Sequence, residues 1–156
     1  MRLVAVVEDR EIHWCMIGGL AINHWAEEAM ATADVDLVIA SEQVDECVNA
    51  LVAHGFVEER FPWSVNLKGR SKVSIQIGTE DFYKDFPSQA VPADVLGILM
   101  RVASLKDTLK GKIKAWSEPT RRASKRQKDL TDMRLIEAHP ELSTDVPEKI
   151  LARFDF

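Results

Sequence analysis

The stretch that decides the fold covers residues 17–39 and reads IGGLAINHWAEEAMATADVDLVI. An apolar segment over residues 12–17 leads into Gly18-Gly19, and a second apolar segment closes the stretch at residues 34–39. Apolar residues at helical spacing between the two segments predict a helix over residues 20–30. The pattern therefore predicts a strand, a diglycine turn, a helix and a second strand in direct succession.

The diglycine turn has the properties of an anion site. Gly18 and Gly19 lack a Cβ, so the backbone can turn tightly there and a ligand can approach its N–H groups closely. The N-terminus of the helix that follows offers unpaired N–H donors and a partial positive charge. We therefore predict that Gly18 and Gly19 contact a phosphate group. A diglycine alone is also compatible with a plain turn.

The second strand carries an acidic pair, Asp34 and Asp36, with Val35 between them. Side chains alternate along a strand, which places both carboxylates on one face of the sheet. They repel each other unless a divalent cation lies between them, and oxygen ligands with free coordination positions suit Mg²⁺ shared with substrate phosphates. Two solvated acids are the alternative interpretation, but the order of glycines, helix and acids makes a metal site the more specific one.

Length and composition limit the class of protein. The chain has 156 residues and a mass of 17.6 kDa, enough for one domain with a sizeable core. Cys15 and Cys47 form no metal-binding motif, which argues against structural zinc. No apolar run approaches the ~20 residues of a membrane helix, and the first residues, MRLVAVVEDREIHW, do not resemble a signal peptide. We therefore expect a cytoplasmic protein without membrane contact.

Charge is unevenly distributed. The net charge is −5, but residues 101–128 carry ten Lys or Arg and only two acidic residues, a local charge of +8. The rest of the chain has ten basic and 23 acidic residues, a charge of −13. A basic segment on an acidic body indicates either a site for an anion or a solvated helix face.

The remaining pattern predicts an α/β (α+β) fold, a core sheet followed by a C-terminal helical appendage. We expect a core over residues 1–102 and a helical region over 103–156, packed as one compact unit. Helices are predicted at residues 2–9, 41–55, 105–116, 125–139 and 146–154, with Ser41 and Ser104 as N-caps. Strands are predicted at 12–17, 34–40, 56–61, 64–68, 72–77 and within 93–101, and residues 81–92 are expected to be irregular.

These motifs resemble the nucleotidyltransferase fold of the DNA polymerase beta superfamily, and within it the AbiEii-type nucleotidyltransferase toxins. The resemblance covers residues 14–135. It rests on Gly18-Gly19-Leu20-Ala21 followed by Thr32-x-Asp34-x-Asp36, and on Leu105-Lys106-Asp107, Gly111-Lys112 and Arg126-Gln127-Lys128-Asp129-Leu130-x-Asp132. It implies a mixed sheet flanked by helices.

The resemblance also implies a chemistry. Such a protein moves a nucleoside monophosphate from an NTP to a hydroxyl of an RNA (tRNA) or protein acceptor with Mg²⁺, as part of a toxin–antitoxin or phage-defence system with a cognate antitoxin. Asp34 and Asp36 would be the catalytic, Mg²⁺-binding acids. The residues implied to bind the nucleotide are Gly18, Gly19, Lys112, Arg126 and Lys128.

The sequence departs from the superfamily at the third carboxylate, which belongs on a later strand. The matching positions here are Ser74 and Gln76, while Glu80 and Asp81 follow the strand as possible substitutes. This departure leaves a second hypothesis, a catalytically inactive member that binds nucleotide or serves as an interaction module. A third is a small nucleic-acid binder that uses residues 101–128.

Aromatic residues give a weaker signal. The four tryptophans, Trp14, Trp25, Trp63 and Trp116, are scattered and are predicted to anchor the core or an interface. Tyr83 is the one aromatic residue for which stacking on a base is considered.

Overall fold

The computed structural model describes residues 2–27, 34–71, 73–95, 97–118 and 123–153. The helices are α1 (Arg2–Asp9), α2 (Gly18–Ala26), α3 (Val44–Ala53), α4 (Phe86–Gln89), α5 (Leu105–Trp116), α6 (Ala123–Asp132), α7 (Arg134–Ala138) and α8 (Glu148–Arg153). The strands are β1 (Trp14–Ile17), β2 (Asp34–Ile39), β3 (Val57–Phe61), β4 (Ser64–Lys68), β5 (Ser74–Gly78), β6 (Val91–Val95) and β7 (Ile98–Val102). Short 3₁₀ turns lie at Ser41–Gln43, Asp81–Tyr83 and Pro140–Asp145.

The strands form one mixed sheet in the order β3-β4-β5-β2-β1-β7-β6. The β2–β5 and β1–β7 pairs are parallel, and the other four pairs are antiparallel. β1 and β2, the two strands that flank the diglycine turn, are neighbours near the centre. The predicted mixed sheet flanked by helices is confirmed.

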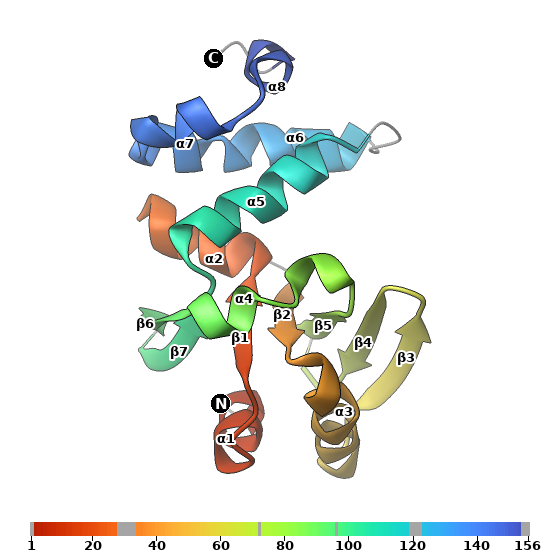
Figure 1. Cartoon of the computed structure of the whole chain (residues 1–156). Coiled ribbons are helices and arrows are strands. Elements are labelled where there is room, and N and C mark those ends of the chain that lie inside the picture. The colour runs from red at the N-terminus through yellow and green to blue at the C-terminus, as the bar shows by residue number, and fades with distance from the viewer. Residues whose placement is uncertain (1, 28–33, 72, 96, 119–122, 154–156) are drawn as a thin grey trace.

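Helices cover both faces of the sheet (Figure 1). α1 and α3 lie on one side, where Val7 and Leu51 pack with Val35, Leu37 and Ile39 of β2 in the main hydrophobic cluster. α2 and α5 lie on the other side, and α6, α7 and α8 stack beyond them. The alternation along β2 therefore buries its apolar residues against α1 and α3, and turns its acids toward α2 and α5.

The helix α2 joins the sheet to the C-terminal helices. Its Ala21 belongs to the main cluster, while the next residue, Ile22, belongs to a second cluster. That second cluster is formed mainly by α5, α7 and the segment after it, with Trp116, Met133 and Leu135 fully buried. The C-terminal helices thus pack on the helix that begins at the diglycine turn.

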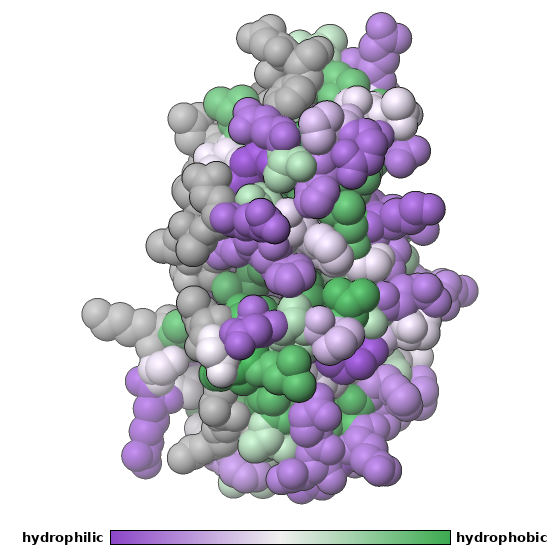
Figure 2. All heavy atoms as spheres, turned by 90° about the vertical axis from the view of Figure 1, so that its left-hand side faces the viewer, coloured by the Kyte–Doolittle hydropathy of each residue, from purple (hydrophilic) through white to green (hydrophobic). Residues whose placement is uncertain are grey.

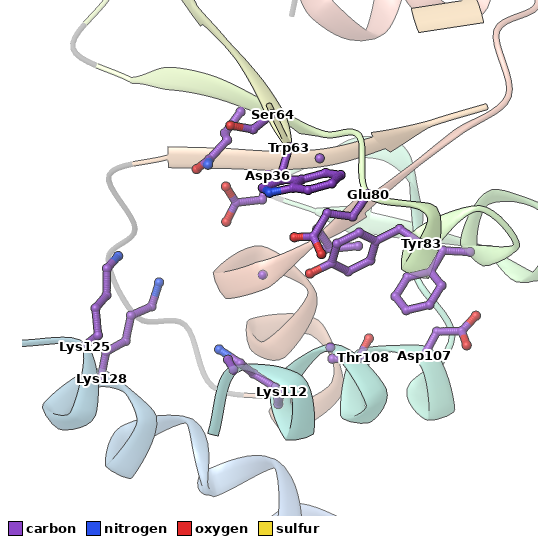
Figure 3. Close-up of a pocket in the computed structure, with 17 residues that line it drawn as sticks. Asp36, Trp63, Ser64, Glu80, Tyr83, Asp107, Thr108, Lys112, Lys125 and Lys128 are labelled. Carbon is purple, nitrogen blue, oxygen red and sulfur yellow. The ribbon is translucent and has the colours of Figure 1, made fainter. Parts of the chain in front are cut away.

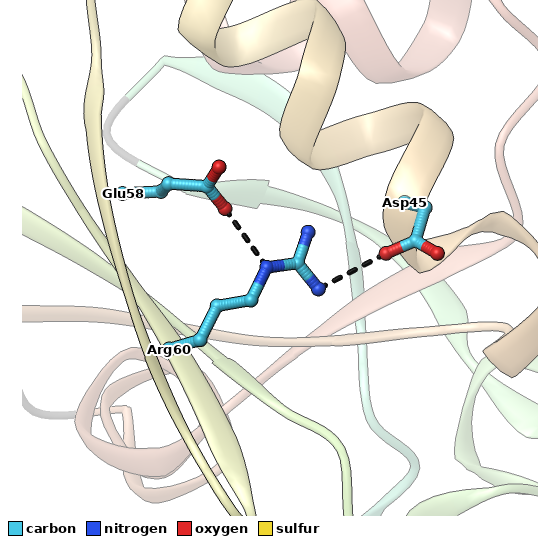
Figure 4. A network of polar contacts seen from close by, with 3 residues as sticks. All are labelled: Asp45, Glu58 and Arg60. Carbon is cyan, nitrogen blue, oxygen red and sulfur yellow. Dashed lines mark hydrogen bonds and ion pairs between the residues drawn. The ribbon is translucent and has the colours of Figure 1, made fainter.

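An exposed ion-pair network links the outer strand β3 to α3 (Figure 4). Arg60 lies between Asp45, with Nη1 3.0 Å from Oδ1, and Glu58, with Nε 2.9 Å from Oε2. All three side chains are exposed, so each pair contributes little to stability, because water and salt screen the charges.

The visible surface is that of a protein whose helices and strands bury most of their apolar side chains. The face at the left of Figure 1 is mainly hydrophilic, with hydrophobic patches between the charged groups (Figure 2). Within the described ranges, none of the helices has the length and apolar character needed to span a bilayer.

The structure differs from the predicted strands at one end of the sheet. The single strand expected within residues 93–101 is a hairpin, because β6 and β7 pair antiparallel with Val95 opposite Ile98. Gly97 has a φ of +80°, which favours glycine, and its N–H donates to Asp94 Oδ1 at 2.8 Å. Residues 81–92, expected to be irregular, contain a 3₁₀ turn, α4 and the start of β6.

Several helix boundaries also differ from the predictions. α2 begins at Gly18 itself and ends at Ala26, because Glu27 adopts a left-handed conformation with φ +54°. Ser41 does not cap α3, since a 3₁₀ turn precedes that helix. Ser104 does cap α5, accepting a hydrogen bond from the Asp107 N–H at 3.1 Å. The helix expected over residues 125–139 is two helices, α6 and α7, that meet at the buried Met133 without a glycine or proline.

A buried ion pair holds α5 to α6. Lys112 Nζ lies 2.7 Å from Asp132 Oδ2, and both side chains are almost completely buried. Removing one partner of such a pair leaves an uncompensated charge in a region of low dielectric constant.

We therefore expect Asp132→Ala to lower the free energy of unfolding by about 3 kcal/mol. Urea denaturation followed by circular dichroism measures this change. Asp145→Ala, at an exposed position in the Pro140–Asp145 turn, is the control and should leave the midpoint unchanged. Equal midpoints for Asp132→Ala and wild type would show that the pair does not stabilise the helical region.

Candidate active site

A cleft of about 370 Å³ opens between the sheet and the C-terminal helices. The residues that line it come from the diglycine turn, from β2 and β5, from the β3–β4 turn, from the segment around α4, and from α5 and α6. They are Ile17, Gly18, Asp36, Trp63, Ser64, Gln76, Gly78, Glu80, Tyr83, Phe86, Asp107, Thr108, Gly111, Lys112, Ala115, Lys125 and Lys128.

The diglycine turn and the acidic strand meet inside this cleft. Ile17 of β1 is paired with Asp36 of β2, so Gly18 follows directly beside the acid. Gly18 has a φ of +68°, and a Cβ added there would lie 3.1 Å from the Asp36 Cβ and clash with the carboxylate. Only glycine fits this position without a shift. Gly19 is buried within α2 and does not line the cleft.

Asp34 and Asp36 lie on the same face of the sheet, as their alternation predicts. The parallel β2–β5 register places Asp34 opposite Ser74 and Asp36 opposite Gln76. Ser74 Oγ donates to Asp34 Oδ1 at 2.9 Å. Asp36 lines the cleft and is partly buried, whereas Asp34 is exposed beside it.

The surroundings of Asp36 do not favour its charge. Burial raises the pKa of Asp36 above its ordinary value, and the neighbouring Asp34 raises it further. Lys128, Lys112 and Lys125 act in the opposite direction and lower this pKa. A divalent cation bound here would relieve both burial and repulsion. Two carboxylates beside an open cleft also leave coordination positions for substrate oxygens, so the residues present fit Mg²⁺.

Three lysines face the acid from the helices across the cleft. Figure 3 shows Lys112 on α5, and Lys125 and Lys128 on α6, opposite Asp36. Lys125 and Lys128 are exposed, whereas Lys112 is buried and donates to Asp132. Lys112 therefore already holds a carboxylate partner.

The residues predicted to bind the nucleotide do not all line the cleft. Gly18, Lys112 and Lys128 line the cleft together, and Gly19 is buried in α2 and does not line it. The backbone of Arg126 belongs to α6, but its side chain lies outside the described part of the chain. Thr32 of the resemblance motif also lies outside the described residues.

The third-carboxylate position is uncharged, and a different acid reaches the cleft. Ser74 is hydrogen-bonded to Asp34, and Gln76 lines the cleft with an amide. Glu80 lines the cleft near Asp36 and Tyr83 (Figure 3), with its Oε2 3.0 Å from Lys114 Nζ.

Asp81, the other substitute considered, does not line the cleft. Its side chain is 91% exposed and lies 3.8 Å from Lys84 Nζ. No group of three or more His, Cys, Asp or Glu side chains within the described ranges is arranged to hold a metal ion. Any cation here would therefore depend on substrate oxygens for part of its coordination.

Aromatic side chains line the part of the cleft beyond Glu80. Trp63 lies at the β3–β4 turn and is 67% exposed, so of its two predicted roles the core anchor is excluded and the interface anchor stays a prediction. Trp14 and Trp116 are buried in the core. Tyr83 contacts Phe86 edge to face, with ring centroids 5.2 Å apart. Burial raises the pKa of the Tyr83 phenol, which keeps the ring neutral.

Sequence reasoning missed several lining residues, and part of the signal was present. One stripe of α5 joins the predicted Lys112 to the missed residues Asp107, Thr108, Gly111 and Ala115, since residues three or four apart lie on the same side of a helix. Asp107 resembled an ordinary first-turn acid of a helix capped by Ser104. The positions of Lys125 and Trp63 follow from the packing of α6 and from the β3–β4 turn, which no local pattern reveals.

Comparison with solved structures places the fold among nucleotidyltransferases. The antibiotic-resistance factor ANT(2″)-Ia in complex with adenylyl-2″-tobramycin superposes with a TM-score of 0.67 and 16% identity, covering 98% of this chain and 92% of that one. Lincosamide antibiotic adenylyltransferase LnuA, bound to lincomycin, gives 0.60 and 11%, with 85% and 92% covered. A protein from Thermotoga maritima, described as a "putative nucleotidyltransferase", gives 0.55 and 11%, with 72% and 80% covered.

The family assignment comes from the sequence itself. No curated protein matches the chain. The family model described as "Nucleotidyl transferase AbiEii toxin, Type IV TA system" matches residues 3–156, nearly the whole chain. The resemblance drawn from the glycine and aspartate motifs is confirmed, and the chain belongs to the AbiEii family of nucleotidyl transferase toxins of type IV toxin–antitoxin systems.

Proposed function

We propose that this protein is a Mg²⁺-dependent nucleotidyltransferase that moves a nucleoside monophosphate from an NTP to a hydroxyl of an RNA or protein acceptor. The observation that carries the proposal is the position of Asp36. Its partly buried carboxylate lies against the Gly18 turn, with three lysines across the same cleft. Acid, helix N-terminus and cations converge on one space, an arrangement that suits a metal-loaded triphosphate.

The triphosphate would lie between the diglycine turn and α6. The N–H groups at the start of α2 offer hydrogen bonds, and Lys125 and Lys128 supply positive charge from the opposite wall. Lys112 adds charge while it holds Asp132, and Arg126 belongs to the same helix as the other two lysines.

Asp34 and Asp36 would hold Mg²⁺. When bound, the ion aligns the α-phosphate and neutralises the charge that develops on it. Ser74 orients Asp34 through its hydrogen bond, and Gln76 can offer an amide oxygen beside Asp36.

Glu80 is the group best placed to act as the third carboxylate. It enters the cleft two residues after the end of β5, on the side of Asp36, and its Oε2 lies 3.0 Å from Lys114 Nζ. An ionised carboxylate there can accept the proton of the attacking acceptor hydroxyl.

The biological role follows the family. A toxin of a type IV system implies a cognate antitoxin, and RNA (tRNA) or protein acceptors would place the reaction in the cytoplasm. The uncharged Ser74 and Gln76 favour a second candidate, an inactive member that binds nucleotide without transferring it. The two candidates differ in whether label from an NTP reaches an acceptor.

We expect Asp36→Asn to reduce Mg²⁺-dependent transfer of label from α-labelled NTPs to acceptors in a cell extract by about 100-fold or more, because it removes a metal-binding charge. The same substitution should raise the melting temperature of the metal-free protein, because a carboxylate whose pKa is raised by burial destabilises the folded state when ionised. Transfer activity equal to that of wild type in Asp36→Asn would contradict the proposed mechanism. Asp9→Asn, at the exposed end of α1, is the control.

A second pair of variants tests the third carboxylate. Glu80→Gln should lower kcat by about 10²–10⁴-fold with little change in nucleotide binding, because it removes the proton acceptor and preserves the shape. Asp81→Asn is the matched control outside the cleft and should keep full activity. Equal rates for the two variants would exclude Glu80 as the base. Nucleotide binding by wild type without any label transfer would favour the inactive member.

A further inference from the structure

The inner end of the cleft holds an acid that the proposed transfer does not use. Asp107 is 8% exposed, and its neighbours Thr108 and Phe86 are 5% and 3% exposed. It lies away from Lys125 and Lys128, beyond Tyr83 (Figure 3). Among the described residues, none donates a hydrogen bond to its buried Oδ2.

The backbone N–H of Asp107 has a hydrogen-bond partner within the fold, but the side-chain Oδ2 has none. The Asp107 N–H donates to Ser104 Oγ as part of the helix cap, and Thr108 donates its hydroxyl to the Ala103 carbonyl. A buried polar atom without a partner destabilises the folded state, and such atoms in folded proteins call for an explanation. A ligand that donates a hydrogen bond to Oδ2 would remove this destabilisation.

The charged and titratable groups around Asp107 do not supply that hydrogen bond. Burial, and then Asp107 itself, raise the pKa of the nearby Cys15 to about 12, and this protonated thiol makes no hydrogen bond with Asp107 Oδ2. Arg101 also acts on Cys15, but its Nη2 donates to the carbonyls of Pro87 and Ala90. The cleft side of Asp107 is therefore left for a ligand.

The spacing along α5 fits one nucleoside. Asp107 and Lys112 are five residues apart, about 7.5 Å along the helix axis, so a base can reach Asp107 while its phosphates lie at the lysine end. Gly111 lies between them, and a Cβ added there would meet no atom within 4 Å, which leaves room for a sugar. Tyr83 and Phe86 offer ring surfaces beside the base.

The burial of Asp107 determines which of the two substrates, the NTP or the acceptor, can contact it. An RNA or protein acceptor must enter from the open side of the cleft, whereas Asp107 and Phe86 are almost completely enclosed. A small planar group that is part of the NTP can reach this end.

We propose that Asp107 is a specificity-determining residue that accepts an N–H of the nucleobase, so that the site prefers NTPs whose base carries an exocyclic amino group. A carboxylate only accepts hydrogen bonds. Adenine, guanine and cytosine each present an amino group, whereas the single N–H of uracil lies between two carbonyl oxygens that a carboxylate repels. This inference rests on the proposed function, because it assumes that an NTP occupies the cleft.

Calorimetric titration with the α,β-methylene analogues of ATP, GTP, CTP and UTP, each with Mg²⁺, tests the assignment. We expect wild type to bind at least one of the amino-bearing analogues about tenfold more tightly than the UTP analogue. Asp107→Asn, whose amide donates as well as accepts, should lose this preference and bind the UTP analogue more tightly. Asp45→Asn, which removes another first-turn helix acid, is the matched control and should keep the wild-type preference.

Inorganic tripolyphosphate with Mg²⁺ tests phosphate binding separately from base recognition by Asp107, because it has no base. It should bind wild type and Asp107→Asn equally. If neither tripolyphosphate nor any NTP analogue binds wild type, the proposed function fails. If the analogues bind but wild type does not discriminate against UTP, or Asp107→Asn keeps the wild-type order, the role of Asp107 is overturned and the proposed function stands.

Discussion

The close contact between Gly18 and Asp36 is the constraint on which the rest of the site depends. The antiparallel pairing of β1 with β2 brings the end of one strand beside the acid of the other, and no side chain fits between them. α2 therefore has to begin at the glycine, with its N-terminus at the carboxylate. The sheet, the helix and the proposed phosphate site are positioned by one steric requirement.

Electrostatics explains why the C-terminal helices belong to the site. Asp36 is partly buried on a strand and has a second acid two residues away, so its charge needs compensation from outside the sheet. Lys125 and Lys128 provide part of it from α6, and the buried Lys112–Asp132 pair holds that helix against α5. The basic segment recognised in the sequence is thus one wall of the cleft.

The cleft is also polarised along its length. Lysines and the acidic strand occupy one end, aromatic rings the middle, and Asp107 the closed inner end. A nucleotide has the same order of groups, with phosphates, sugar and base. The uncharged Gln76 opposite Asp36 and the nearby Glu80 indicate that a carboxylate can reach such a site from a turn instead of a strand.

Local patterns were sufficient for the alternation of β2, the diglycine turn and the Ser104 cap, because each depends on residues close together in the sequence. They were sufficient for the family as well, because it is recognised from short motifs of this kind in a fixed order along the chain. They were not sufficient for the hairpin at Gly97 or for the break between α6 and α7. They also could not show that Glu80, and not Asp81, enters the cleft, or that Asp107 is buried with an oxygen left over. These features depend on contacts between segments far apart in the chain, and only the folded arrangement of sheet and helices decides them.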